Sequence, residues 1–146
     1  MKKFIITLFA LITSFTANAK EYNKNETKDC SQNAIVMLCD LEGEPITGVV
    51  KSYYDNGNLK LEGNFKDGKY EGLGKGYYEN GNLKVEGNFK DGKEEGLEKR
   101  YYENGNLKGE INYKDGKAVS GYMYDIDGEK KEMTNAHLHN MTKNLK

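Results

Sequence analysis

Apolar and polar residues alternate along the segments that follow each Asn-Gly pair of this chain. Across residues 83–89 the odd positions read Leu, Val, Gly and Phe, and the even positions read Lys, Glu and Asn. Residues 107–113 show the same alternation, with Leu, Gly, Ile and Tyr at the odd positions. A period of two is that of a β-strand with one buried face and one solvated face. The pattern therefore predicts a sheet with one apolar face and one charged face.

The alternating segments belong to a unit that occurs three times at a spacing of 24 residues. One block, Tyr-Tyr-Asp/Glu-Asn-Gly-Asn-Leu-Lys, begins at positions 53, 77 and 101, and a second, Asn-Phe/Tyr-Lys-Asp-Gly-Lys, begins at positions 64, 88 and 112. One unit can bury about five sizeable side chains, worth about 10 kcal/mol. Ordering its backbone costs about 1–2 kcal/mol per residue. Each unit must therefore pack on its neighbours, and the ends of the array need caps.

Each unit contains two predicted turns. Asn-Gly and Asp-Gly are the dipeptides that best tolerate the positive φ angles of type I′ hairpin turns. The spacing of the glycines leaves room for one strand of about five to seven residues plus a turn. We therefore predict an all-β fold, a single-layer antiparallel meander of β-hairpins with a short C-terminal helix as a cap. The predicted turn residues are Asn56, Gly57, Asn80, Gly81, Asn104, Gly105, Asp67, Gly68, Asp91, Gly92, Asp115 and Gly116.

The two adjacent tyrosines before each Asn-Gly pair must point to opposite faces of the sheet. A two- or four-residue loop would place Tyr78 opposite Leu83, whereas a three-residue loop would place Tyr77 there. We expect the first arrangement, and the same in the other two copies. The predicted core then consists of Tyr54, Leu59, Leu61, Phe65, Tyr78, Leu83, Val85, Phe89, Tyr102, Leu107, Ile111 and Tyr113.

The other tyrosine of each pair is expected to form a ladder on the outer face. A single-layer sheet leaves one face uncovered, and tyrosine offers a large contact area at a low entropic cost. Packing within a thin sheet is the alternative role for these side chains. The predicted binding surface consists of Tyr53, Tyr77, Tyr101, Lys75 and Lys99.

The N-terminal residues have the pattern of a secretory signal peptide. Lys2 and Lys3 precede a mostly apolar run over residues 4–15, and Ala17-Asn18-Ala19 supplies the small residues that a signal peptidase reads. We expect cleavage after Ala19 and a periplasmic or secreted protein, with an uncleaved anchor as the alternative. The run is too short to span a bilayer as a stable helix.

The sequence on either side of the repeats divides the rest of the chain. We assign residues 1–19 to the signal peptide, 20–45 to an N-terminal cap, 46–117 to three repeats, 118–130 to a degenerate half-repeat and 131–146 to a C-terminal helix or tail. Thr134 or Asn135 is a suitable N-cap for that helix, and Leu138, Met141 and Leu145 share one of its faces.

Two cysteines, Cys30 and Cys39, lie in the expected N-terminal cap. An exported protein meets oxidising conditions, so we expect them to form a disulfide. Two unpaired thiols are the alternative. Zinc binding is disfavoured, because two thiols without clustered histidines do not make a tetrahedral site.

Composition and motifs argue against catalysis. The formal net charge of −1 gives no basic footprint for nucleic acid. His137 and His139 are the only histidines, and two residues apart on a helix they face different sides. The glycine-rich segment Gly72–Gly76 lacks the following helix of a phosphate-binding loop. We therefore expect no enzymatic activity, cofactor or metal; the oligomeric state stays open.

The segment 86–93, followed by Gly96 and the block at 101–105, resembles the MORN repeat. It is most similar to the bacterial variant found in the YwqK antitoxin family. The resemblance covers about residues 46–117, and the third copy departs from the pattern with Glu98 in place of glycine. It implies a hairpin array used for binding proteins or membrane lipids. We expect an exported protein that binds another protein, such as a toxin, with peripheral attachment to a membrane or the cell envelope as the alternative.

Overall fold

The computed structural model describes residues 20–29 and 37–143 of the chain. The predicted signal peptide over residues 1–19, Cys30 and Leu145 lie outside these ranges. Within the described ranges, no helix is long and apolar enough to cross a membrane.

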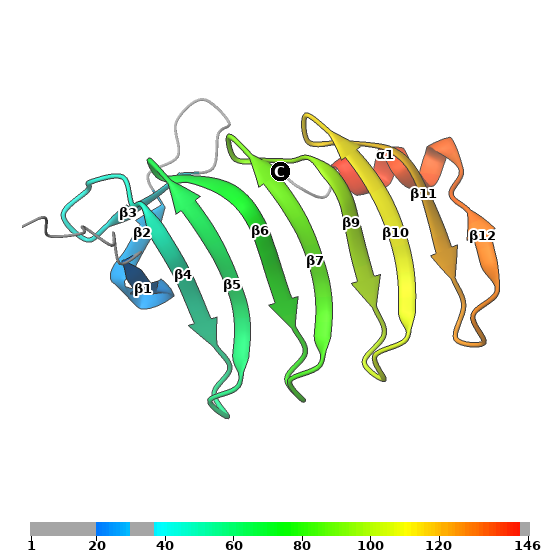
Figure 1. Ribbon diagram of the computed structural model, residues 1–146, viewed down its shortest axis with the longest axis horizontal. Helices are drawn as coiled ribbons and strands as arrows, with labels where there is room; N and C mark the ends of the chain where they lie inside the picture. Colours follow the sequence, from blue (N-terminus) through cyan, green and yellow to red (C-terminus); the bar gives the residue numbers. More distant parts are fainter. Residues whose placement is uncertain (1–19, 30–36, 144–146) are drawn as a thin grey trace, which may run out of the picture.

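In the described residues nearly all regular structure is β-strand, and one α-helix lies at their C-terminal end. The elements are β1 (Glu21–Asn23), η1 (Lys24–Glu26), β2 (Thr27–Asp29), β3 (Leu38–Asp40), β4 (Gly48–Tyr53), β5 (Leu59–Lys66), β6 (Lys69–Tyr77), β7 (Leu83–Lys90), β8 (Lys93–Glu94), β9 (Gly96–Tyr101), β10 (Leu107–Lys114), β11 (Lys117–Tyr124), β12 (Lys130–Glu132) and α1 (Asn135–Lys143). The main sheet has the order β1-β4-β5-β6-β7-β9-β10-β11-β12, with β8 paired to β7 (Figure 1). From β4 onward it is an antiparallel meander, as predicted.

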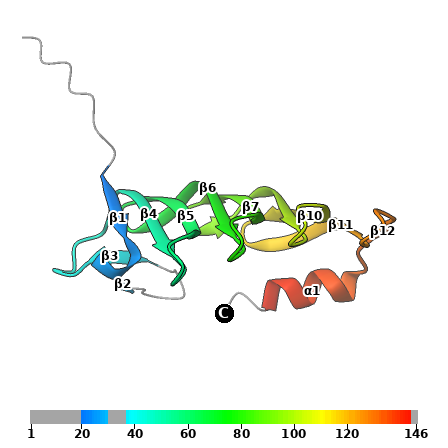
Figure 2. The same cartoon turned by 90° about the horizontal axis from the view of Figure 1, so that it is seen from below.

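The two faces of the sheet are unequal. Figure 2 shows α1 and the β2–β3 pair on one side of the sheet, at opposite ends, while no described element covers the other side. We call the side that carries α1 the inner face and the bare side the outer face. The sheet is thus a single layer with partial cover, as the alternation predicts.

The buried core is split into two clusters at the ends of the inner face. The first packs β1 and β3 on the first repeat, and the second packs α1 and Met133, which lies between β12 and α1, on β10. They consist of Tyr22, Leu38, Ile46, Val50 and Phe65, and of Ile111, Tyr113, Met133 and Leu138. The caps therefore provide much of the burial that the repeats alone do not reach.

This division changes the predicted core. Only Phe65, Ile111 and Tyr113 of that set are buried, and Leu61 is 38% exposed. The remaining predicted core side chains are half-buried: these are Tyr54, Leu59, Tyr78, Leu83, Val85, Phe89, Tyr102 and Leu107. Val85 and Phe89 are half-buried because no second layer covers the middle of the inner face.

The Asn-Gly turns are not type I′ turns. In the first copy Tyr54 N donates to Asn58 O at 2.8 Å, and Gly57 N donates to Tyr54 O at 2.9 Å. Gly57 has a φ of +86° while Asn56 keeps a negative φ, which is the three-residue loop with glycine in the left-handed position. The Asp-Gly turns do have positive φ at both residues, as type I′ requires; Asp67 has +49° and Gly68 has +78°.

A β-bulge follows each of these loops and corrects the predicted pairing. Leu83 pairs with Tyr77, not with Tyr78, and Val85 pairs with the preceding Gly76, so Lys84 is the extra residue. Leu59, Leu83 and Leu107 therefore lie beside Tyr53, Tyr77 and Tyr101 on the outer face.

The second tyrosine of each pair lies in the loop instead of the core. Tyr54 Oη donates to Tyr77 O at 2.7 Å, and Tyr78 Oη donates to Tyr101 O at 2.8 Å. Tyr102 makes the equivalent bond to Tyr124 O. These hydroxyls tie each loop to the next repeat, which explains their half-buried state.

The ends of the chain show two further expected features. Thr134 Oγ1 accepts a hydrogen bond from His137 N at 3.4 Å, so Thr134 is the N-cap of α1. Cys39 is 2% exposed and disulfide-bonded. Its expected partner, Cys30, lies outside the described residues.

Candidate functional site

A groove of about 460 Å³ lies on the inner face between the two core clusters. Its floor includes Gly74, Gly76 and Gly87, and Val85 and Phe89 line it from β7. Met133 and Met141 line it on the side of α1. The floor is flat because successive glycines on β6 carry no side chain on this face. Lys75, between two of these glycines, reaches the groove with its backbone, since its side chain alternates to the outer face.

Tyr70 closes the groove toward the N-terminal cap. Its ring lies between Phe65 and Phe89, with ring centroids 4.6 and 4.1 Å away. The ring lies over Gly63 and Gly74, where an added Cβ would overlap its hydroxyl. Burial, followed by the nearby Glu62 carboxylate, raises the pKa of Tyr70 to about 12. Tyr70 is therefore a fixed, neutral wall of the groove.

The centre of the groove carries charge in an apolar setting. Arg100 Nε donates to Glu98 Oε1 at 2.6 Å, and Glu98 is only 9% exposed. Glu94 lines the same groove, and its pKa is raised, mainly by burial and further by Glu98. Arg100 is paired with Glu98, and Glu94 has no ion pair of its own within the described residues, so the centre has an excess of negative charge.

Two lysines line the groove at its loop end. Lys84 and Lys108 lie with their ammonium groups 5.4 and 5.2 Å from the ring centroids of Tyr78 and Tyr102. These cation–π contacts hold the two lysines at the rim. The acidic centre and the basic rim therefore occupy different parts of the groove.

A comparison of the second and third copies of the repeat also identifies the inner face as the variable one. Residues 70–93 and 94–117 agree at 18 of 24 positions. All six differences fall on the inner face, at residues that line the groove or belong to the C-terminal cluster. The pairs are Tyr70 and Glu94, Gly74 and Glu98, Gly76 and Arg100, Val85 and Gly109, Gly87 and Ile111, and Phe89 and Tyr113. Sequence reasoning missed the groove, although this comparison was the signal that could have found it.

The outer face repeats without change between these two copies. The register joins Lys51, Glu62, Lys75, Glu86, Lys99 and Glu110 in one row across six strands. Next to that row, Tyr77 Oη donates to Glu62 Oε1 at 2.8 Å and Tyr101 Oη donates to Glu86 Oε1 at 2.9 Å.

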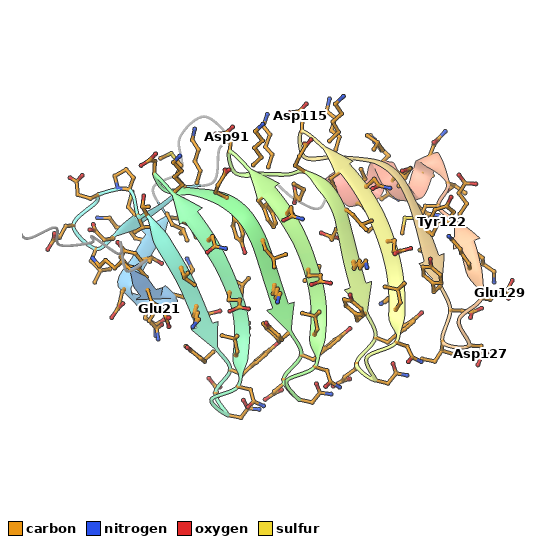
Figure 3. All side chains as sticks on the ribbon, viewed as in Figure 1. Glu21, Asp91, Asp115, Tyr122, Asp127 and Glu129 are labelled. Atoms are coloured by element: carbon orange, nitrogen blue, oxygen red, sulfur yellow. The ribbon has the colours of Figure 1, made fainter. Side chains whose placement is uncertain are left out.

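The predicted binding surface is therefore one continuous surface on the outer face. Tyr53 is 46% exposed there, beside Leu59. Burial, together with the hydrogen bond to a glutamate, raises the pKa of Tyr77 and Tyr101 to about 12. Their hydroxyls stay neutral and serve as donors. Figure 3 shows the side chains of this bare face standing above the strands.

The fold and these surfaces define a class of protein: a repeat array with two open surfaces. Within the described ranges, no group of three or more His, Cys, Asp or Glu residues could hold a metal ion. The family described as MORN repeat variant matches residues 46–67, 70–91 and 94–115. The chain thus carries three copies of the MORN repeat variant, and MORN repeats generally occur in modules that bind proteins or membranes. No curated protein matches the chain.

Proposed function

We propose that this protein is a non-enzymatic binding module that takes a segment of a partner protein into the groove on its inner face. The observation that carries this proposal is the position of the six differences between the second and third copies. Ile111 and Tyr113 pack under the C-terminal cap, so the fold accounts for those two residues. The other differing residues of the third copy line the open groove, as a site for one particular partner would require. Here the outer face stays identical and the inner face changes.

The lining of the groove indicates an apolar segment. Its volume lies within the range of about 300–1,000 Å³ that ligand sites occupy. Phe89, Val85 and two methionines offer apolar surface, and methionine adapts its shape to what it contacts. Each apolar side chain that a partner buries there gains about 1.5–3 kcal/mol.

The charge at the centre adds a second requirement. Glu94 is half-buried beside the Arg100–Glu98 ion pair, which leaves its carboxylate without a salt bridge among the described residues. A lysine or arginine within the apolar segment would offset this second carboxylate in a setting where charge pairs are weakly screened. The partner segment is therefore apolar with one basic side chain.

The proposed location is outside the cytoplasm, supported by the signal-like pattern of residues 1–19. An immunity or antitoxin function is the specific form that the similarity to the YwqK family suggests. In that form the partner is a toxin, and co-expression of this protein would restore growth of cells that produce the toxin.

Peptide display on the purified full chain tests the proposal. We expect enrichment of apolar peptides that contain a lysine or arginine, with affinity lost in Val85→Lys, which places a charge on the groove wall. Val119→Lys is the matched control, since Val119 is 55% exposed on β11 and does not line the groove. Equal loss in both variants, or no enrichment of such peptides, would refute the proposal.

A further inference from the structure

The outer face carries a row of charges that alternates strand by strand. From β4 to β10 the row reads Lys, Glu, Lys, Glu, Lys, Glu, and each member pairs in register with the next. Read in the reverse direction, the same row is Glu, Lys, Glu, Lys, Glu, Lys. The row is therefore the charge complement of its own reversal.

We propose that two copies of this protein associate through their outer faces about a two-fold axis that runs parallel to the strands between β6 and β7. Such an axis reverses the order of the strands in the second copy but keeps the position along each strand. It places every lysine of the row opposite a glutamate of the other copy. Lys75 meets Glu86 on both sides of the axis, and Glu62 meets Lys99 one strand further out.

The same axis places each flanking row of the outer face against itself. In one row Tyr53, Tyr77 and Tyr101 meet the leucines Leu107, Leu83 and Leu59 of the other copy. In the other row Leu73 and Leu97, each 41% exposed, meet Asn88 and Asn64 of the other copy. The tyrosine and leucine row then forms the apolar part of the contact. A periodic surface of this kind suits a partner with the same period, which a second copy provides.

The charged side chains of the row can still form ion pairs with a second copy. Within the described part of the chain, Lys75 and Lys99 have no ion pair within 4 Å. Glu62 and Glu86 each accept one tyrosine hydroxyl through a single oxygen, and a carboxylate accepts more than one bond. Lys51 already bonds to Glu21 at 3.0 Å, so the inner four members of the row carry most of the attraction.

The area fits a stable dimer. The six strands of the row, β4, β5, β6, β7, β9 and β10, span about 29 Å at about 4.8 Å per strand, and about seven residues per strand extend about 23 Å. The product is about 670 Å², within the range of about 600–1,000 Å² per partner of a standard interface.

The edge strands of the sheet are not a favourable alternative site for association with a second copy. The last strand, β12, has three residues, two of them lysines, and β1 is equally short. Short, charged edge strands disfavour edge-to-edge pairing. The groove on the inner face stays open in the dimer, which would present two grooves and bind a divalent partner more tightly.

Charge reversal tests the inference on the full chain, expressed with its own N-terminal segment. We expect a dimer by sedimentation equilibrium, and a weakening of roughly 10- to 100-fold in Lys75→Glu and in Glu86→Lys, because each change puts two like-charge contacts at the axis. A mixture of the two variants should form a heterodimer, since all six rungs are then complementary. An effect on folding within one chain would not be rescued by mixing.

A monomeric wild-type protein at millimolar concentration would overturn the inference, and so would two dimeric single variants or a mixture that stays monomeric. Val85→Lys serves as the control for the other face and should leave the dimer unchanged. The dimer and the groove are thus tested separately, because Val85→Lys removes peptide binding alone and Glu86→Lys, at a residue that does not line the groove, removes dimerisation alone.

Discussion

Gly63→Ala tests how the groove wall is built. Gly63 faces the ring of Tyr70, whose atoms are the three nearest to an added Cβ, and that Cβ would overlap the hydroxyl. The ring must then leave its place between Phe65 and Phe89. Each aromatic contact is worth about 0.5–1.5 kcal/mol beyond the buried area, so the loss is about 1–3 kcal/mol. Replacing a strand glycine by alanine returns about 0.5–1 kcal/mol.

We therefore expect the free energy of unfolding to fall by about 1 kcal/mol, and by no more than about 2.5 kcal/mol, in Gly63→Ala. Urea unfolding followed by far-ultraviolet circular dichroism measures it. The informative control is the same substitution in a Tyr70→Ala background, where no ring stands above the glycine. There the alanine should be neutral or stabilise by up to about 1 kcal/mol. An equal cost of Gly63→Ala in both backgrounds would refute the proposed packing of Tyr70.

Three further predictions concern single groups and pH. Burial raises the pKa of Glu94, so the free energy of unfolding is higher while Glu94 is protonated, below about pH 4, and falls as the pH rises. Glu94→Gln should therefore be more stable than wild type at pH 7 but not at pH 3 in urea titrations. Asp91 has a φ of +51°, so Asp91→Val should cost about 1–3 kcal/mol and Asp91→Asn should cost little in the same assay. The raised pKa values of four tyrosines predict that stability is full below about pH 10 and declines toward pH 12, as alkaline unfolding would show; a flat profile would contradict it. These tyrosines are Tyr70, Tyr77, Tyr101 and Tyr113.

Local pattern was sufficient to predict the meander. Alternation and the 24-residue spacing define strands and turns through interactions a few residues apart, and Asp67-Gly68 adopts the expected backbone. The Asn-Gly loops were misassigned because Asn56 Oδ1 accepts from Asn58 N, an Asx turn that holds the asparagine at negative φ. The equivalent loop of the second copy has three residues instead of the expected two or four. Leu83 therefore pairs with Tyr77 and lies on the outer face.

The core and the groove depend on long-range contacts that no local pattern contains. Ile46 and Val50 are buried because β1 and β3 fold back onto the first repeat, and Ile111 is buried because Met133 and Leu138 cover it. The groove is what these two caps leave open between them. The residues that line it still left a trace in the sequence, since they are where two otherwise identical copies differ.

Site-specific photo-crosslinking in living cells tests most directly that the groove holds a partner protein. A photo-reactive amino acid at position 85 should give a covalent adduct, and the crosslinked peptide should be apolar with a lysine or arginine. The same group at position 119 should give no such adduct. Adducts of equal yield at both positions, or none at position 85 in cells that export the folded protein, would contradict the proposed function.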